Sequence, residues 1–187
     1  MTLYSPEYQS LLQTYHAQRP TWGTSGHTIA SCIRQLISDQ HFTSVLDYGC
    51  GDGSLRRAIM HDPPACLTRF DEYDPGVISK ETCPDRMYDL VVCRDVLEHV
   101  EPEYLSVVIS HLYILTNKMC WCQIAYIPAP AILPDGRNAH LSLYTPYEWA
   151  QRLAQHDWAV IMEDEDHQHC WIQCEKMAFF EKEKNFT

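Results

Sequence analysis

The sequence predicts an α/β fold, a three-layer sandwich in which helices cover both faces of a mostly parallel β-sheet. Three observations indicate this class. Strand patterns alternate with amphipathic helix patterns along most of the 187 residues, as in folds built on a parallel sheet. The central strand patterns are apolar at consecutive positions, which is typical of strands buried on both faces. The last two strand patterns are separated only by a short acidic segment, which predicts an antiparallel C-terminal hairpin.

The length of the chain corresponds to one domain. We expect residues 1–42 to form an N-terminal helical cap segment, residues 43–175 to form the core, and residues 176–187 to form a tail. Apolar residues make up 45% of the sequence and charged residues 21%, which is the composition of a folded chain rather than a disordered one.

The charge balance excludes some classes of partner. The chain has 14 Lys and Arg residues against 25 Asp and Glu residues, a net charge of −11, which argues against a nucleic-acid partner because phosphates need a basic face. The longest uncharged stretch, residues 119–134, is shorter than a membrane-spanning helix and contains three prolines, so no membrane contact is expected. Nine cysteines without paired spacing, and an N-terminus without a signal-peptide pattern, predict a reduced, cytoplasmic protein. Nothing in the sequence indicates an oligomeric state.

The first half of the predicted core is a helix, a strand and a short helix. Residues 26–39 place apolar side chains on one helical face, with Ser25 as the predicted N-cap. A strand at residues 44–47 leads into a glycine-rich segment. The helix at residues 55–60 ends before Asp62-Pro63-Pro64, because proline does not continue a helix.

The second half alternates strands and helices and ends in the hairpin. Thr145, Pro146 and Glu148 predict a helix start with a capping box. The other predicted elements are strands at 66–70, 88–93 and 119–127, a helix at 103–115, and hairpin strands at 158–162 and 169–174 joined by an acidic turn at 163–166.

Residues 47–53, with the sequence DYGCGDG, are the most informative segment. They follow the first strand directly, and ligands of open α/β sheets bind at the carboxyl ends of the strands. Alternate glycines allow close backbone approach and positive φ angles. Asp47 and Asp52 would repel a pyrophosphate but suit a cationic ligand. Ser54 stands where a dinucleotide motif has its last glycine, so a NAD-type ligand is disfavoured; a plain tight turn is the alternative.

At this point the sequence resembles a known family. The segment VLDYGCGDG (residues 45–53) is similar to the first motif of class I S-adenosylmethionine (SAM) dependent methyltransferases. Three further segments resemble later motifs of that family in the same order: YDP at 73–75, YDLVVCRDVLEHVEP at 88–102, and NAHL with YTP within 138–146. The resemblance covers roughly residues 43–175. It implies a Rossmann-like methyltransferase sandwich with a SAM-binding core and SAM as cofactor, whose ammonium and sulfonium groups suit the acidic loop.

The resemblance also assigns cofactor-binding residues. It implies that Asp47 and the glycine loop hold the aminoacyl end of SAM. Asp74 would take the ribose hydroxyls, with Asp71 as a rival and an ordinary turn residue as the alternative. Asp95 would either contact the cofactor or cap the next helix. The predicted cofactor-binding set is Asp47, Gly49, Cys50, Gly51, Asp74 and Asp95.

The chain departs from the family pattern after Asp74. Only 14 residues separate Asp74 from Asp89, where the family has a helix, a strand and another helix. We therefore expect the third-strand region to be shortened or missing. Adenine contacts would then come from residues 75–87 or from residues 93–95.

Methyl transfer requires alignment of the acceptor and, for a weakly acidic acceptor, a base. His140, which follows the fifth strand in the family order, is the predicted catalytic residue; a structural histidine bonded to the backbone is the alternative. Asp135, Arg137 and Asn138 share its loop, where they either orient a substrate or form a turn. For His99 a packing or capping role is expected.

Tyr15, Trp22 and Gly23 are candidates for a lid over the cofactor. Near the C-terminus, four residues are of types that bind metals: His167, His169, Cys170 and Cys174. No metal site is expected, because residues on alternate positions of a strand face opposite sides of the sheet, so these side chains would not converge on one ion.

Together these interpretations predict a SAM-dependent methyltransferase that acts on a small-molecule or compact acceptor. The shortened third-strand region would remove part of the wall around adenine. The alternative is therefore a non-catalytic methyltransferase-like binding or scaffold protein.

Overall fold

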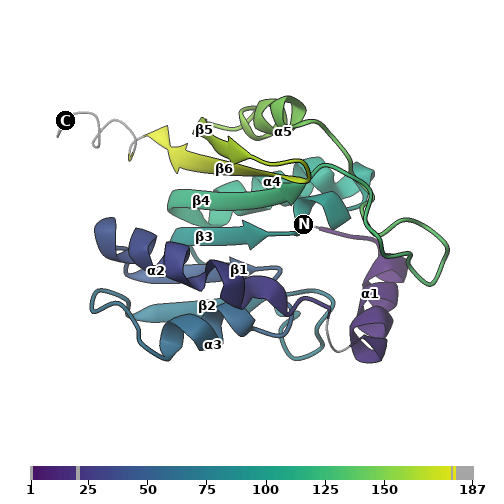
Figure 1. Ribbon diagram of the computed structural model, residues 1–187, viewed down its shortest axis with the longest axis horizontal. Helices are drawn as coiled ribbons and strands as arrows, with labels where there is room; N and C mark the ends of the chain where they lie inside the picture. Colours follow the sequence, from purple (N-terminus) through teal and green to yellow (C-terminus); the bar gives the residue numbers. More distant parts are fainter. Residues whose placement is uncertain (1, 20–21, 178, 180–187) are drawn as a thin grey trace.

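The computed structural model of the chain describes residues 2–19, 22–177 and 179. Its centre is a sheet of six strands in the order β2-β1-β3-β4-β6-β5 (Figure 1). The pairs among β1 to β4 are parallel, whereas β6 is antiparallel to both β4 and β5. The strands are β1 (Ser44–Tyr48), β2 (Arg69–Tyr73), β3 (Tyr88–Arg94), β4 (Thr116–Ala125), β5 (Trp158–Glu165) and β6 (His169–Lys176).

Helices cover both faces of this sheet, which confirms the predicted three-layer sandwich. The helices α2 (Ala30–Asp39) and α3 (Ser54–Met60) pack on one face, and α4 (Pro102–Leu115) and α5 (Pro146–Leu153) pack on the other. The remaining helices are α1 (Pro6–Gln18) and two 3-10 helices, η1 (Ser25–Ile29) and η2 (Leu97–His99).

Strand β3 shows why its sequence is apolar at consecutive positions. Leu90 and Val92 pack in the core beside α2 and α3, whereas Val91 and Cys93 pack in the core beside α4 and α5. All four side chains are fully buried, because a parallel strand between two helical layers has no solvent-facing side.

The predicted bounds of the second strand were wrong by three residues. Cys66 and Leu67 are apolar, but they lie in a turn in which the Leu67 N–H donates to the Pro64 carbonyl at 3.0 Å. The strand begins where Arg69 pairs with Ser44 of β1. Pairing with a neighbouring strand, and not local apolarity, sets this start.

The predicted N-cap at Ser25 was also wrong. The helix pattern begins as η1, and α2 starts only at Ala30, without a side-chain cap. The Ser25 hydroxyl instead accepts a hydrogen bond from Arg94 Nη1 at 2.9 Å, so Ser25 joins the N-terminal segment to the end of β3.

The predicted capping box of α5 is confirmed. The Thr145 hydroxyl accepts from the Glu148 N–H, and the Glu148 carboxylate accepts from the Thr145 N–H. The hairpin strands are longer than predicted, since β5 runs to Glu165, and Asp166 closes the turn by accepting from the N–H groups of Gln168 and His169.

Residues 74–87, between β2 and β3, contain neither a helix nor a strand, which confirms the shortened third-strand region. The segment folds back on the glycine-rich loop. The Asp74 N–H donates to the Lys80 carbonyl at 3.0 Å, and Lys80 Nζ donates to the Gly51 carbonyl at 3.2 Å and to Glu72 at 3.1 Å. These hydrogen bonds hold residues 74–87 against the glycine-rich loop, which follows the carboxyl end of β1.

All nine cysteines are free thiols. Within the part of the chain that the structure describes, no helix combines the length and apolar character needed to cross a membrane. Most of the predicted tail, residues 176–187, lies outside the described residues.

Candidate functional site

The carboxyl ends of the parallel strands open into a cavity of about 480 Å³, a volume typical of small-molecule sites. Helix α1 lies beyond these strand ends (Figure 1), and its residues Tyr8, Leu12 and His16 line the cavity. The structure brings together every residue predicted for cofactor binding and catalysis, since all of them line this cavity: Asp47, Gly49, Cys50, Gly51, Asp74, Asp95 and His140.

The glycine loop uses its own N–H groups inside the protein. The Gly49 and Cys50 N–H groups donate to the Tyr73 carbonyl at 2.7 and 3.1 Å, and the Gly51 N–H donates to Asp74 Oδ2 at 2.8 Å. The Asp52 N–H donates to Gly23 and the Gly53 N–H to Cys50. Because none of these five donors is left for a ligand, the loop does not form a pyrophosphate cradle, which argues against a dinucleotide.

The glycines permit close packing around the cavity. Gly51 has a φ of +52°, and a Cβ atom there would lie 2.3 Å from the Gly23 carbonyl oxygen. A Cβ atom on Gly49 would lie 2.2 Å from Val96 Cγ2. Side chains at these positions would separate the glycine loop from its neighbours.

Asp47 is buried at the end of β1. Burial, followed by the negative charge of Glu72, raises the pKa of the Asp47 carboxyl to about 8, although Lys80 and Arg94 act in the opposite direction. A buried carboxyl with a raised pKa favours a cationic ligand, because a positive charge would stabilise its ionised form. Burial also raises the pKa of the neighbouring Cys50 thiol, so Cys50 is a neutral part of the wall.

Asp74, and not Asp71, reaches the cavity. Asp74 Oδ1 and Oδ2 accept from the N–H groups of Gly76 and Gly51, each at 2.8 Å. A carboxylate oxygen has two lone pairs, so each oxygen retains one for a ligand hydroxyl. Asp71 does not line the cavity, and its Oδ2 accepts from the Tyr88 hydroxyl at 2.8 Å.

Asp95 occupies a strained bend, with a φ of +51°. Its Oδ2 lies 3.5 Å from Arg94 Nη2, whereas its Oδ1 is buried without a hydrogen bond. It does not cap the following helix, since η2 has no side-chain cap. Of the segments predicted to contact adenine, Pro75, Arg94 and Asp95 line the cavity.

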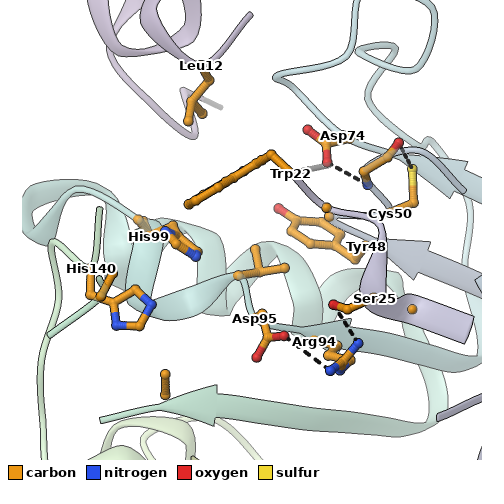
Figure 2. A pocket seen from close by; sticks show the side chains of 18 of the residues that line it. Leu12, Trp22, Ser25, Tyr48, Cys50, Asp74, Arg94, Asp95, His99 and His140 are labelled. Carbon is orange, nitrogen blue, oxygen red and sulfur yellow. Dashed lines mark hydrogen bonds and ion pairs between the residues drawn. The ribbon is translucent and has the colours of Figure 1, made fainter. Parts of the chain in front are cut away.

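His99 and His140 lie side by side on the opposite wall (Figure 2), with ring centroids 4.9 Å apart and planes at 75°. The Nδ1 atoms of His99 and His140 are hydrogen-bonded to the carbonyls of Ala139, at 2.7 Å, and Ile127, at 2.5 Å. A carbonyl only accepts, so Nδ1 carries a proton in each ring and Nε2 is the nitrogen that remains without a hydrogen bond to the main chain. His140 is therefore bonded to the backbone, as the alternative of a structural histidine predicted, and it also lines the cavity.

Burial, then the neighbouring His140, lowers the pKa of His99 to about 4, so His99 is neutral at pH 7. His99 packs as expected, against Trp22 with ring centroids 5.3 Å apart. It is more than a packing residue, however, because it lines the cavity.

Glu98 is a residue that the sequence analysis missed. It is completely buried, and its Oε1 accepts from the Ala125 N–H at 2.9 Å while its Oε2 has no hydrogen-bond partner. Burial, followed by the charge of Asp95, raises the pKa of Glu98 to about 8. The sequence offered little signal, because Glu98 stands in a segment of mixed apolar and charged residues, RDVLEHVE at 94–101.

The loop around His140 supports the site from outside. Asn138 Oδ1 accepts from the N–H groups of Ala129 at 3.0 Å and His140 at 2.9 Å, so Asn138 fixes the loop. Arg137 pairs with Asp135 at 2.7 Å. None of the predicted orienting residues, Asp135, Arg137 and Asn138, lines the cavity.

Helix α1 lies in the N-terminal segment that was predicted to be helical, but its bounds were not predicted, although its start is readable. Ser5 is its N-cap, accepting from the Tyr8 N–H at 3.1 Å, and Pro6 begins the helix, a common pattern at helix starts. Of the predicted lid residues, Trp22 and Gly23 line the cavity, whereas Tyr15 does not and packs against Trp22 with ring centroids 4.8 Å apart.

Comparison with known proteins agrees with this arrangement. The family model described as "Methyltransferase domain" matches residues 15–173. A search of curated proteins finds no match.

Solved structures share the fold at low sequence identity. One is the 1,6-didemethyltoxoflavin-N1-methyltransferase of Burkholderia thailandensis, bound to 1,6-didemethyltoxoflavin and S-adenosylhomocysteine (TM-score 0.64, 15% identity, 94% of this chain and 92% of that chain). Another is a DhpI complex with S-adenosylhomocysteine (TM-score 0.61, 16% identity, 90% and 92%). A third is the magnesium protoporphyrin IX methyltransferase of Synechocystis PCC 6803 with bound SAM (TM-score 0.55, 17% identity, 82% and 80%). The chain belongs to the methyltransferase domain family and has the class I, Rossmann-like fold that its motifs predicted.

Proposed function

We propose that the protein transfers a methyl group from SAM to a small-molecule or compact acceptor. One observation carries the proposal: a single cavity has two chemically different ends. The cofactor end consists of Asp47, the glycine loop and Asp74, and the acceptor end consists of His99 and His140. Figure 2 shows Asp74 and Cys50 on one side, the two histidines on the other, and the Trp22 ring edge-on between them.

The cofactor end suits the charges and hydroxyls of SAM. Asp47 would face a positive charge of the cofactor, and the free lone pairs of Asp74 would accept from the ribose hydroxyls. Asp95, whose Oδ1 has no hydrogen bond and lies 4.0 Å from His169 Nε2, is the remaining proposed cofactor contact. The solved neighbours with bound SAM or S-adenosylhomocysteine support this choice of cofactor.

At the acceptor end, the acceptor atom would attack the sulfonium methyl carbon in line with the breaking bond. The sulfur keeps the electron pair and becomes a neutral thioether, and the acceptor loses its proton. His140 is the proposed catalytic residue, since its Nε2 is free to assist that proton loss. Tyr8, Leu12 and Trp22 would exclude water from the displacement.

A small acceptor fits the cavity of about 480 Å³ and the net charge of −11. The neighbours bound to 1,6-didemethyltoxoflavin and named for magnesium protoporphyrin IX support the same class. A cytoplasmic location stays a prediction, and the nine free thiols are consistent with it.

The cofactor assignment is tested by calorimetry with S-adenosylhomocysteine. Asp74→Asn should bind it about tenfold more weakly than the wild type, which corresponds to about 1.4 kcal/mol, because a charged acceptor of ribose hydrogen bonds is lost. Asp71→Asn is the matched control, since Asp71 lies on β2, three residues before Asp74, but outside the cavity. Equal affinities for the two variants would remove Asp74 from the site.

Catalysis is tested by formation of S-adenosylhomocysteine from SAM over a panel of phenols, catechols and nitrogen heterocycles. We expect turnover with at least one acceptor, reduced at least about tenfold in His140→Asn while SAM affinity is kept. Tight SAM binding without turnover over the whole panel would favour the non-catalytic binding or scaffold role.

A further inference from the structure

Glu98, His99 and His140 form a compact group at the acceptor end of the cavity. One potential ligand atom from each residue, a carboxylate oxygen or a ring nitrogen, lies within 4.8 Å of the other two. Atoms bound about 2.1 Å from one ion lie about 3–4 Å apart. The ligand atoms of the three side chains therefore need to approach one another by about 1–2 Å at most to share an ion.

The two histidine rings are already oriented in the way that metal-binding histidines commonly are. Both rings are held through Nδ1 by main-chain carbonyls, those of Ala139 and Ile127. Metal-binding histidines commonly donate one ring N–H to a carbonyl, which orients the ring and leaves the other nitrogen free for the ion. The two Nε2 lone pairs are the donors left by this arrangement.

The carboxylates give a second, independent indication. Glu98 is fully buried, and its Oε2 has no hydrogen-bond partner, which is costly for an acceptor taken out of water. Asp95 Oδ1, three residues earlier in the chain, is also buried without a hydrogen bond. A bound cation would give the buried Glu98 oxygen the partner that the protein itself does not supply.

We propose that Glu98, His99 and His140 bind one divalent transition-metal ion at the acceptor end. Two nitrogens and one oxygen suit Zn²⁺ or Mn²⁺ better than Mg²⁺ or Ca²⁺, which prefer oxygen ligands. This site differs from the expectation of no metal, which the sequence analysis drew from residues near the C-terminus. His99 and His140 are 41 positions apart in the chain, and only the fold unites them.

Three protein ligands leave open coordination positions. If the proposed function holds, His140 would assist the acceptor through the ion and not as a free base, because its Nε2 is then a ligand. An acceptor oxygen would occupy one of the open positions and lose its proton more readily there. The methyl acceptor is therefore a hydroxyl or phenol oxygen that can reach the ion. This step rests on the proposed function, whereas metal binding itself does not.

The test uses full-length protein without a polyhistidine tag, freed of metal by a chelator. Mn²⁺ alone is added and followed by calorimetry and by loss of the electron paramagnetic resonance signal of free Mn²⁺. We expect one site with a micromolar dissociation constant. His140→Asn should weaken binding at least about tenfold, because asparagine can still donate to the Ile127 carbonyl but lacks Nε2. His61→Asn, at an exposed position outside the cavity, should bind as the wild type does.

His99→Asn and Glu98→Gln are parallel variants, and S-adenosylhomocysteine binding and far-ultraviolet circular dichroism report folding in the same samples. Folded variants that lose Mn²⁺ support the site. Absence of Mn²⁺ binding by the wild type up to millimolar concentration would overturn it, as would wild-type affinity in every folded variant. Mn²⁺ binding without S-adenosylhomocysteine binding would instead contradict the proposed function and leave the metal site standing.

Discussion

At the residue scale, the burial of Asp47 determines which ligand charge the site favours. Its carboxyl is enclosed at the end of β1, and its pKa is raised to about 8. At pH 7 it is therefore mostly protonated in the free protein. A bound cation would stabilise the ionised form and lower this pKa, so binding and proton release are linked.

We predict that the wild type releases up to about one proton on binding S-adenosylhomocysteine at pH 7, whose ammonium group supplies the positive charge. Asp47→Asn has no proton to release and should also bind more weakly. Affinity for the wild type should rise with pH up to about 8, because less work is then needed to ionise Asp47. Calorimetry in two buffers of different ionisation enthalpy measures the proton count, and an equal count for both proteins would contradict this assignment.

Gly51 illustrates a conformation and a contact that only glycine allows. It combines a φ of +52° with the approach to the Gly23 carbonyl, whereas Gly136 has a φ of +87° and open space around it. Gly136→Ala thus reports backbone strain alone, and Gly51→Ala adds a steric clash.

We predict that Gly136→Ala lowers the free energy of unfolding by about 1–2 kcal/mol. Gly51→Ala should cost clearly more and should also weaken S-adenosylhomocysteine binding about tenfold, because the loop must move away from Gly23. Urea unfolding and calorimetry measure both effects. Similar losses in the two variants would show that the contact with Gly23 is unimportant.

At the element scale, α1 closes the cavity and is fastened by polar contacts from distant parts of the chain. The N–H and hydroxyl of Ser5 both donate to the Glu101 carboxylate at 2.8 Å. The Tyr8 hydroxyl donates to the His99 carbonyl at 2.6 Å. These contacts join the start of α1 to η2 and to the start of α4, directly beside the acceptor end.

We predict that Tyr8→Phe loosens α1 without unfolding the protein. Loss of one buried hydrogen bond should cost about 1 kcal/mol and should speed hydrogen exchange of the α1 amides. Ser10→Ala is the control, since the Ser10 hydroxyl bonds only within its own helix, to the Pro6 carbonyl. Hydrogen exchange followed by mass spectrometry compares the two, and unchanged α1 exchange in Tyr8→Phe would show that this bond does not hold the helix.

At the scale of the whole molecule, the short segment 74–87 makes β2 the edge of the sheet. Charged residues along β2, including Arg69 and Glu72, suit an edge strand, because charges discourage pairing with another chain. The same segment supplies Lys80 to the glycine loop. The sheet is therefore narrower on this side, while Asp74 and Pro75 of the same segment still line the cavity.

Local patterns predicted much of this molecule. The capping box of Thr145 spans four residues, so the sequence alone identifies it. The continuous apolar run 90–93 of β3 predicted a central strand, because burial on both faces leaves no solvent-facing position in that run. The start of β2 was misplaced, because it depends on pairing with Ser44, which lies 25 positions away.

The sequence by itself determined the layered α/β class, the order of the elements, the acidic glycine loop and the family, because these depend on periodicity and on motifs contained in short segments. The tertiary structure alone decided that Glu98 is buried with an unpaired oxygen, that His99 lies against His140, and that Gly23 closes on Gly51. The reason is physical: burial and contacts between distant residues arise only when the helices pack on the sheet, and no local pattern records which side chains then meet.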